Sequence, residues 1–182
     1  PLVENMPSAS AIRPGDIIKT GKGTTIEVVN TDAEGRLILA DSLEYSQKFK
    51  PTLVIDMATL TGQADSITDN KASIILGNNN KILNKIIDIG DEINDKAINM
   101  PIWRDFVDQT KSDIADYKNL DISSNGGTTI YAGAFLSNFV PAKTDWVHID
   151  LGGSYTTNPR HYNSHGCTGV GVNLITNLIE QL

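Results

Sequence analysis

Residues 24–49, TTIEVVNTDAEGRLILADSLEYSQKF, change from a strand pattern to a helix pattern across one polar segment. The β-branched run Thr24–Val29 is typical of a strand. Apolar residues between Glu34 and Phe49 recur at intervals of three and four, which predicts a helix with one apolar face. The octet Asn30–Leu37 therefore joins a strand to a helix.

Strand and helix patterns also alternate along the rest of the chain. Predicted strands are Ile17–Ile18, Leu53–Ile55, Ser73–Gly77 and Trp146–Leu151, and predicted helices are Asn78–Ile98, Trp103–Lys111, Ile130–Val140 and Gly169–Leu182. A turn is expected at Thr20–Gly23 and a polar loop over residues 154–168. Strands that alternate with helices imply an α/β layered domain, so we expect a mixed β-sheet flanked by helices.

The composition is that of an ordinary globular protein. The chain has 182 residues, which at about 100–200 residues per domain is one domain or a large part of one. Its formal net charge of -7 argues against nucleic acid or an anionic membrane as the main partner. No apolar run approaches the roughly 18–20 residues of a membrane span. Cys167 is the only cysteine, so an internal disulfide is excluded and a cytoplasmic location is expected.

The octet carries two carboxylates and an arginine at intervals of two residues. In an extended backbone, residues i and i+2 point to the same side, so Asp32 and Glu34 would share one side. Two hard carboxylate ligands suit one or two divalent cations, and the guanidinium of Arg36 suits an oxyanion. In the structural alternative, Asp32 caps the helix, Glu34 faces its positive end and Arg36 is a solvated charge. Spacing alone favours this alternative, because the pattern D-x-E is common.

The whole octet, Asn-Thr-Asp-Ala-Glu-Gly-Arg-Leu, resembles the signature of the leucyl aminopeptidase family, the dizinc cytosol aminopeptidases. Further blocks in the same order carry the resemblance through most of the chain: Glu4–Ser8, Arg13–Asp16, Ile55–Gly62, Ser112–Asp116, Ala132–Leu136, Trp146–Asp150 and Gly166–Leu174. The resemblance implies the fold of the dizinc aminopeptidase catalytic domain.

The resemblance also implies a metal-dependent aminopeptidase that releases N-terminal residues, preferentially apolar and leucine-like, from peptides. Asp32 and Glu34 would be ligands of two divalent metal ions (Zn, Mn or Mg) that activate a water, with Glu34 bridging both ions. Arg36 would be a catalytic residue that holds a bicarbonate-like anion. The residues that would bind the substrate are Thr59, Leu60, Gly62, Gly152 and Tyr155. The family assembles as hexamers, so a homo-oligomer is expected.

The family takes its other metal ligands, one Lys and two Asp, and a second catalytic Lys from segments that precede the block at Glu4. Residues 1–182 contain neither those segments nor the family's N-terminal domain, so we expect them to be the C-terminal portion of the catalytic domain. The chain alone is then expected to be inactive. Two alternatives stay open. One is a non-catalytic structural or binding homologue that keeps the fold and oligomer, and the other is a small-molecule-binding α/β domain that uses Gly21–Thr25, which a nucleotide-binding assay would test.

The remaining candidate residues fit no metal or nucleophile pattern. His148, His161 and His165 form no helical ligand pair, and His148 on an alternating strand is expected to be structural. Cys167 has no evident base partner and is expected to be a small buried residue. Tyr155 has an alternative as well, in which its side chain points into the loop over residues 154–168 and contacts no substrate.

Overall fold

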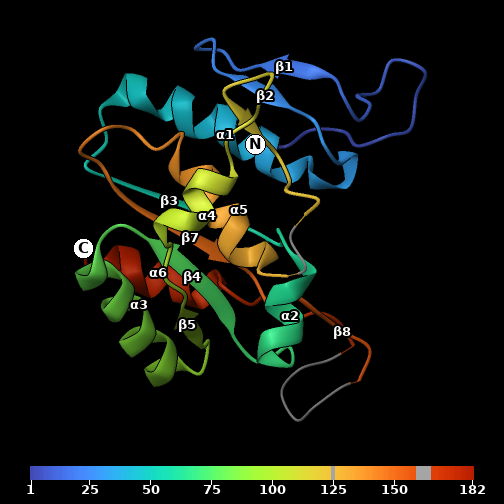
Figure 1. The fold of residues 1–182 in the computed structure, drawn as a ribbon. Helices are drawn as coiled ribbons and strands as arrows, with labels where there is room; N and C mark the ends of the chain where they lie inside the picture. The colour runs from blue at the N-terminus through green and yellow to red at the C-terminus, as the bar shows by residue number, and fades with distance from the viewer. Residues whose placement is uncertain (124–125, 159–164) are drawn as a thin grey trace. The chain divides into compact units, whose positions relative to one another are not determined.

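Strands and helices alternate along the chain in the computed structural model, which describes residues 1–123, 126–158 and 165–182 (Figure 1). The expected α/β fold with mixed sheets and flanking helices is confirmed. The chain divides into two compact units: unit 1 comprises Pro1–Val54 and Ile102–Thr144, and unit 2 comprises Ile55–Pro101 and Asp145–Leu182. No helix in the described part of the chain combines the length and the apolar surface needed to cross a lipid bilayer.

Unit 1 is built on a three-stranded sheet in the order β1-β2-β6. β1 (Ile17–Lys19) and β2 (Thr25–Glu27) form an antiparallel hairpin, as the strand and turn patterns predicted. β6 (Tyr117–Lys118) joins β2 in parallel. The hairpin turn requires glycine at Gly23, because its φ of 103 degrees lies in the left-handed region.

Helix α5 packs against two other helices of unit 1. Helix α1 (Gly35–Ser46) continues into a 3-10 turn, η2 (Gln47–Phe49), and together they match the predicted helix. α1 contacts α5 (Thr128–Ser137), and so does the short helix α4 (Arg104–Gln109). The run Ala132–Ala134 on α5 is buried, so its small side chains allow neighbouring backbones to come close.

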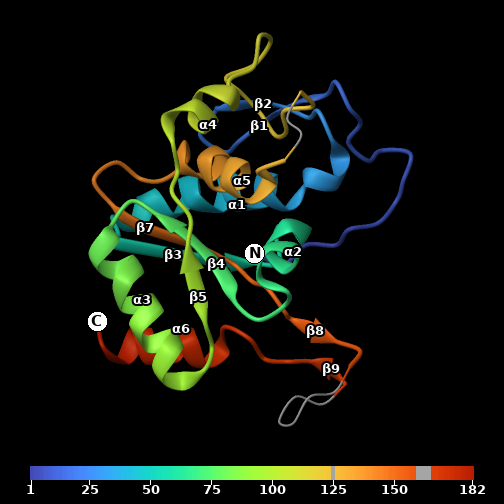
Figure 2. The ribbon, with the colours of Figure 1, turned by 60° about the horizontal axis from the view of Figure 1, so that its bottom comes forward.

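Unit 2 has a four-stranded mixed sheet in the order β3-β7-β4-β5, whose strands are Leu53–Ala58, Asp145–Asp150, Ser73–Gly77 and Ala97–Asn99. β4 runs antiparallel to β7 and parallel to β5. Helices α3 (Asn80–Ile93) and α6 (Val172–Glu180) lie side by side against this sheet (Figure 2). They share one apolar core with β4 and β7, which includes Ile75, Ile86, Val147, Ile149 and Leu174.

The helix predicted to reach Ile98 ends at Ile93, so that expectation was wrong. Asn94 takes a φ of 58 degrees and turns the chain back. The returning chain passes close to Gly90, where a Cβ would lie 2.7 Å from the backbone oxygen of Asp95. The residues that follow pair with β4 as β5, because the sheet satisfies their backbone hydrogen bonds.

Several short features were not predicted. Helix α2 (Gly62–Thr68) follows β3 after a short loop, where only a strand end and a loop were expected, and β6 lies where a polar loop was expected. β8 (Tyr155–Thr156) and β9 (Gly166–Cys167) form an antiparallel pair inside the expected polar loop over residues 154–168. Strands of two residues are too short to leave a recognisable alternation of apolar and polar residues.

Candidate functional site

The octet forms the junction between β2 and α1. Its centre is a short 3-10 helix, η1 (Thr31–Ala33), and Glu34 immediately precedes α1. Asp32 is exposed and Glu34 is half-buried. The Glu34 carboxylate accepts a hydrogen bond of 2.9 Å from the side-chain amide of Asn5. The junction therefore presents one exposed acid and one acid that a neighbour orients.

The structural alternative for these two acids matches the structure only in part. The cap of η1 is Asn30, whose side-chain oxygen accepts from the backbone N–H of Asp32 at 2.9 Å. Glu34 is the cap residue of α1, but its side chain makes no capping hydrogen bond to the described helix. Capping hydrogen bonds therefore do not account for either carboxylate, but Glu34 does lie at the positive end of α1, as the structural alternative expected.

Arg36 is buried and is not a solvated surface charge, since only 4% of its surface is exposed. Its Nη1 donates to the backbone oxygen of Asn119 at 2.9 Å, and its Cζ lies 5.8 Å from the centre of the Tyr131 ring. Burial raises the pKa of the Tyr131 hydroxyl, so this neighbour stays neutral. Burying a guanidinium is costly unless it is hydrogen-bonded, and the contacts made here also fix its orientation.

A second group of predicted residues lies on the loop between β3 and α2, in unit 2. Asp150, at the end of β7, is fully buried. Its carboxylate accepts from the backbone N–H groups of Leu60 at 2.9 Å and Thr61 at 3.1 Å, and from the Thr61 hydroxyl at 2.6 Å. These bonds fix the loop that bears Thr59, Leu60 and Gly62. Sequence analysis did not single out Asp150, whose only signal is its place at the end of a predicted strand.

Gly62, the first residue of α2, leaves open space above its backbone. It is exposed, and no atom beyond its chain neighbours and its own helix lies within 4 Å of the place that a Cβ would take. A peptide could therefore approach the backbone closely at this point.

Gly152 and Tyr155 line one cavity of about 960 Å³ in unit 2. At Gly152 a Cβ would lie 2.3 Å from the backbone oxygen of Ala72, so packing alone requires glycine. Tyr155 is 54% exposed, and its ring meets that of His165 edge to face, with the centres 5.8 Å apart. The residues of the β3–α2 loop do not line this cavity. The structure therefore brings two of the five predicted substrate residues together here.

His148 is fully buried in the sheet of unit 2. Its Nδ1 lies 2.5 Å from Oδ1 of Asp56, and the other oxygen of Asp56 accepts from the indole N–H of Trp146 at 2.7 Å. These contacts tie β3 to β7, which agrees with the structural role expected for His148.

His165 and Cys167 lie at the β8–β9 pair. His161 lies outside the described residues, and His165 packs on Tyr155. Cys167 is exposed, so the expectation of a buried cysteine was wrong. The reason is its position on a two-stranded pair, whose sides are not both covered by a core.

Asp32 and Glu34 are the candidate metal ligands, so their chemistry is compared with what a metal ion requires. Carboxylate oxygens suit hard divalent cations such as Mn²⁺ and Mg²⁺ and are also ligands of Zn²⁺. The donor set therefore fits a divalent cation in its chemistry. Within residues 1–123, 126–158 and 165–182, however, no group of three or more His, Cys, Asp or Glu side chains could hold a metal ion. A coordination shell that included these two acids would therefore need further ligands.

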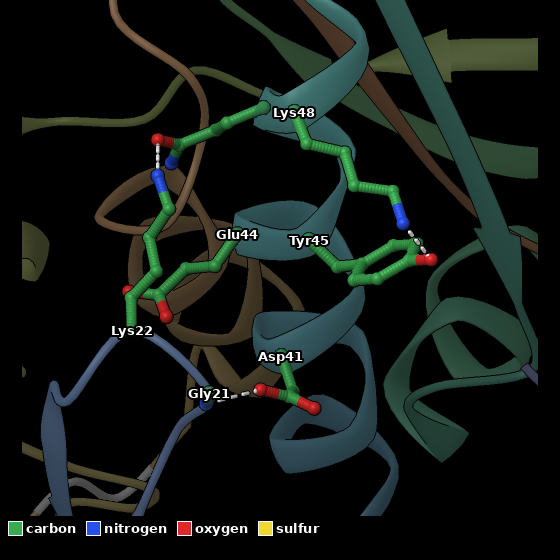
Figure 3. Close-up of a pocket in the computed structure, with 7 residues that line it drawn as sticks. Gly21, Lys22, Asp41, Glu44, Tyr45 and Lys48 are labelled. Atoms are coloured by element: carbon green, nitrogen blue, oxygen red, sulfur yellow. Dashed lines mark hydrogen bonds between the residues drawn. The ribbon is translucent and has the colours of Figure 1, made fainter.

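Unit 1 has a separate cavity of about 420 Å³ between the β1–β2 turn and α1 (Figure 3). The nucleotide-binding alternative would place a phosphate at this turn. The backbone N–H of Gly21 already donates to the Asp41 carboxylate at 2.7 Å, and Glu44 lies in the same wall. Lys22 and Lys48 line the same cavity, so its charged side chains balance and do not by themselves favour a phosphate group. The nucleotide-binding alternative stays a prediction.

Comparison with known sequences gives one consistent result. A sequence model of the Cytosol aminopeptidase family, catalytic domain, matches residues 1–176. The chain is 45% identical to a probable cytosol aminopeptidase of Geobacter sp. (strain M21) and 46% identical to one of Syntrophotalea carbinolica (strain DSM 2380 / NBRC 103641 / GraBd1). Both matches cover 100% of this chain and 36% of the relative, so the chain spans just over a third of the length of these curated relatives.

Solved structures share the fold as well. The bottromycin maturation enzyme BotP superposes with a TM-score of 0.93 and is 30% identical in sequence. The same enzyme in complex with Mn gives a TM-score of 0.92. Each likeness covers 99% of this chain and 40% of the other chain.

Proposed function

Since this chain belongs to the cytosol aminopeptidase family and carries part of its catalytic domain, we propose that the full-length protein releases N-terminal residues from peptides. We infer a metal-dependent exopeptidase with a preference for apolar, leucine-like residues. The observation that carries the proposal is the octet Asn30–Leu37, which places two acids and a buried arginine at one strand-to-helix junction. The family is metal-dependent, and one related structure contains Mn.

In this proposal Asp32 and Glu34 hold the metal. Two divalent ions (Zn, Mn or Mg), when bound, supply Lewis acidity toward a water molecule and toward the peptide carbonyl. The hydrogen bond from Asn5 orients the Glu34 carboxylate, as partners of metal ligands commonly do. Two carboxylates leave a coordination shell incomplete, so the proposal requires further ligands from outside residues 1–182.

We assign Arg36 the role of a catalytic residue that holds a bicarbonate-like anion. Its guanidinium is planar and always charged, so it can bind an oxyanion through paired N–H donors. Asn119 and Tyr131 hold it in one orientation. When bound there, a bicarbonate-like anion would supply a general base, and Arg36 would hold it in place.

Five residues are proposed to bind the substrate. Thr59, Leu60 and Gly62 would bind the peptide backbone, because Asp150 holds their loop rigidly and Gly62 is open to close approach. Gly152 and Tyr155 would form a wall of the first side-chain pocket. We also propose a hexamer and a cytoplasmic location, in keeping with family membership and with relatives named cytosol aminopeptidases.

The test measures Mn²⁺ binding to the metal-free full-length protein by calorimetry, together with release of leucine from a leucyl peptide. Glu34→Ala should lose Mn²⁺ binding and turnover while it keeps its fold, because it removes a proposed ligand. The control Glu92→Ala, on an exposed position of α3, should keep both. Unchanged metal stoichiometry in Glu34→Ala would show that the ligand assignment is wrong. A wild-type protein that binds Mn²⁺ and cleaves no peptide would favour the non-catalytic alternative.

A further inference from the structure

Both polar atoms of the Asn119 side chain form hydrogen bonds to the backbone of the octet (Asn30–Leu37), and one of them also bonds Val29, the residue before the octet. Asn119 directly follows β6 and is fully buried. Its Oδ1 accepts from the backbone N–H groups of Val29 at 2.8 Å and Asn30 at 3.2 Å. Its Nδ2 donates to the backbone oxygens of Asn30 at 2.7 Å and Ala33 at 3.3 Å. A side-chain amide offers two lone pairs and two donor hydrogens, so its full capacity is used.

These four hydrogen bonds lie on both sides of Asp32. Asn119 and Asn30 bond each other in both directions, as paired peptide groups do in a sheet, and Ala33 is bonded on the far side of Asp32. The segment from Val29 to Ala33 lies beyond the end of β2, where the strand ladder has stopped. The side chain of Asn119 therefore supplies backbone hydrogen bonds where those of the strand ladder have ended. These bonds fix the backbone that carries Asp32.

The backbone of Asn119 forms two further hydrogen bonds. Its carbonyl oxygen accepts from Nη1 of Arg36 at 2.9 Å. Its N–H donates to the backbone oxygen of Glu27, the last residue of β2, at 3.0 Å. Asn119 is thus anchored on the sheet, and from there it sets the place of both the Asp32 backbone and the Arg36 guanidinium.

We propose that Asn119 is a positioning residue of the metal site, which acts through Asp32 and Arg36. This inference rests on the proposed function, because it takes Asp32 as a metal ligand and Arg36 as the anion-holding residue. Removal of the partners that orient a metal ligand typically weakens metal affinity or activity about 10- to 100-fold. We expect a loss of the same size when the backbone that carries Asp32 loses its four hydrogen bonds to the Asn119 side chain.

The test compares two asparagine variants of the full-length protein. Asn119→Ala removes the four bonds described above. The matched control is Asn138→Ala, because Nδ2 of Asn138 also donates within unit 1, to the Thr110 hydroxyl and to the backbone oxygens of Ala134 and Phe135. Both variants should lower the Tm. In titrations with MnCl₂, Asn119→Ala should bind Mn²⁺ about 10- to 100-fold more weakly and lose kcat, while Asn138→Ala keeps both values.

Each outcome decides the question. Wild-type Mn²⁺ affinity and kcat in Asn119→Ala would overturn the inference, and so would equal losses in Asn138→Ala, since the amide would then be merely structural. If Asn119→Ala does not fold, the same titration is run on Asn119→Ser, which keeps a short polar side chain. Glu34→Ala is measured in parallel: unchanged Mn²⁺ binding there refutes the proposed function itself. Loss in Glu34→Ala without loss at Asn119 refutes only the positioning role.

Discussion

Arg36 is the residue whose surroundings bear most directly on the proposed chemistry. An exposed arginine samples many rotamers, whereas Arg36 is only 4% exposed and is hydrogen-bonded to the carbonyl of Asn119. The Tyr131 ring lies near the guanidinium and limits its movement further. The side chain is therefore preorganised, so its shape matters as well as its charge.

We predict that Arg36→Lys lowers kcat by at least about tenfold, because an ammonium keeps the charge and loses the planar pair of donors. The Mn²⁺ content of the purified full-length protein should stay unchanged, since Arg36 is not a proposed ligand. Arg104→Lys is the control, because Arg104 is exposed and pairs only with Asp108 among the described residues. Steady-state kinetics measure kcat, and metal analysis measures the Mn²⁺ content. A wild-type kcat in Arg36→Lys would show that Arg36 has no part in the mechanism.

Tyr155→Met should change the choice among substrates. Tyrosine is rigid, whereas methionine is unbranched and adapts to side chains of different shape. If Tyr155 lines the first pocket, the kcat/KM ratios among Leu, Met and Phe amides should shift by an amount equivalent to about 1–3 kcal/mol. Tyr45→Met, at an exposed tyrosine of α1, serves as the control. Unchanged ratios would mean that Tyr155 packs on His165 and contacts no substrate.

At the scale of elements, the attachment of β6 to its sheet is short. It pairs with β2 through only two residue pairs, yet it leads directly into Asn119. Asp116 strengthens this attachment, because its carboxylate accepts from the backbone N–H of Thr25 at 2.8 Å and from the Thr25 hydroxyl at 2.7 Å. The position of Asn119 thus depends partly on a carboxylate that can be titrated.

The stability of this attachment should depend on pH. Hydrogen bonds from the Thr25 backbone and hydroxyl hold the pKa of Asp116 below its ordinary value. A carboxyl with a lowered pKa stabilises the folded state above its unfolded pKa of about 3.9, and the effect is lost as the pH falls through the folded pKa. We predict that Asp116→Asn lowers the Tm most at neutral pH, and that the difference from wild type shrinks below about pH 4.

Thermal melts of the full-length protein between about pH 2 and pH 7 test this prediction. Asp113→Asn is the control, because Asp113 is an exposed neighbour on the same loop, and its melting curve should follow that of the wild type at each pH. A Tm difference for Asp116→Asn that stays constant down to the lowest pH would contradict the prediction.

At the scale of the whole molecule, each unit has its own sheet and holds its own share of the proposed residues. The metal-ligand candidates and Arg36 lie in unit 1, and the five substrate-binding candidates lie in unit 2. The chain spans 36% of the length of its curated relatives. Metal affinity rises with the number of ligands and with a closed geometry, and two carboxylates offer neither.

We therefore predict that the 182-residue chain, purified alone, binds Mn²⁺ weakly and exchangeably and shows no peptidase activity above the buffer. The full-length protein, assayed in parallel, should bind Mn²⁺ and release leucine. Equilibrium dialysis and a leucyl-peptide assay measure the two properties. Robust cleavage by the isolated chain that a chelator abolishes would refute the proposed need for further ligands.

Local patterns in the sequence were enough for the α/β class, for most strands and helices, and for the family. Apolar periodicity predicted α1, and an apolar run that ends at a glycine predicted β4, because each pattern extends over a complete element. The eight-residue signature identified the junction that bears Asp32 and Glu34, whose role as ligands stays a prediction. The same approach failed at Ile98, because pairing with β4 outweighed a continued helical period. It also missed strands as short as β8 and β9.

The burial of Arg36, the hydrogen bonds of Asn119 to the octet and the bonds of Asp150 to the β3–α2 loop came from the folded structure alone. These contacts join residues 83 to 90 positions apart. Such hydrogen bonds form only when distant segments meet, after the entropic cost of closing long loops has been offset by packing. A pattern that repeats every two to four residues cannot record such contacts, whereas Asp32 and Glu34 are visible in eight consecutive residues of the sequence.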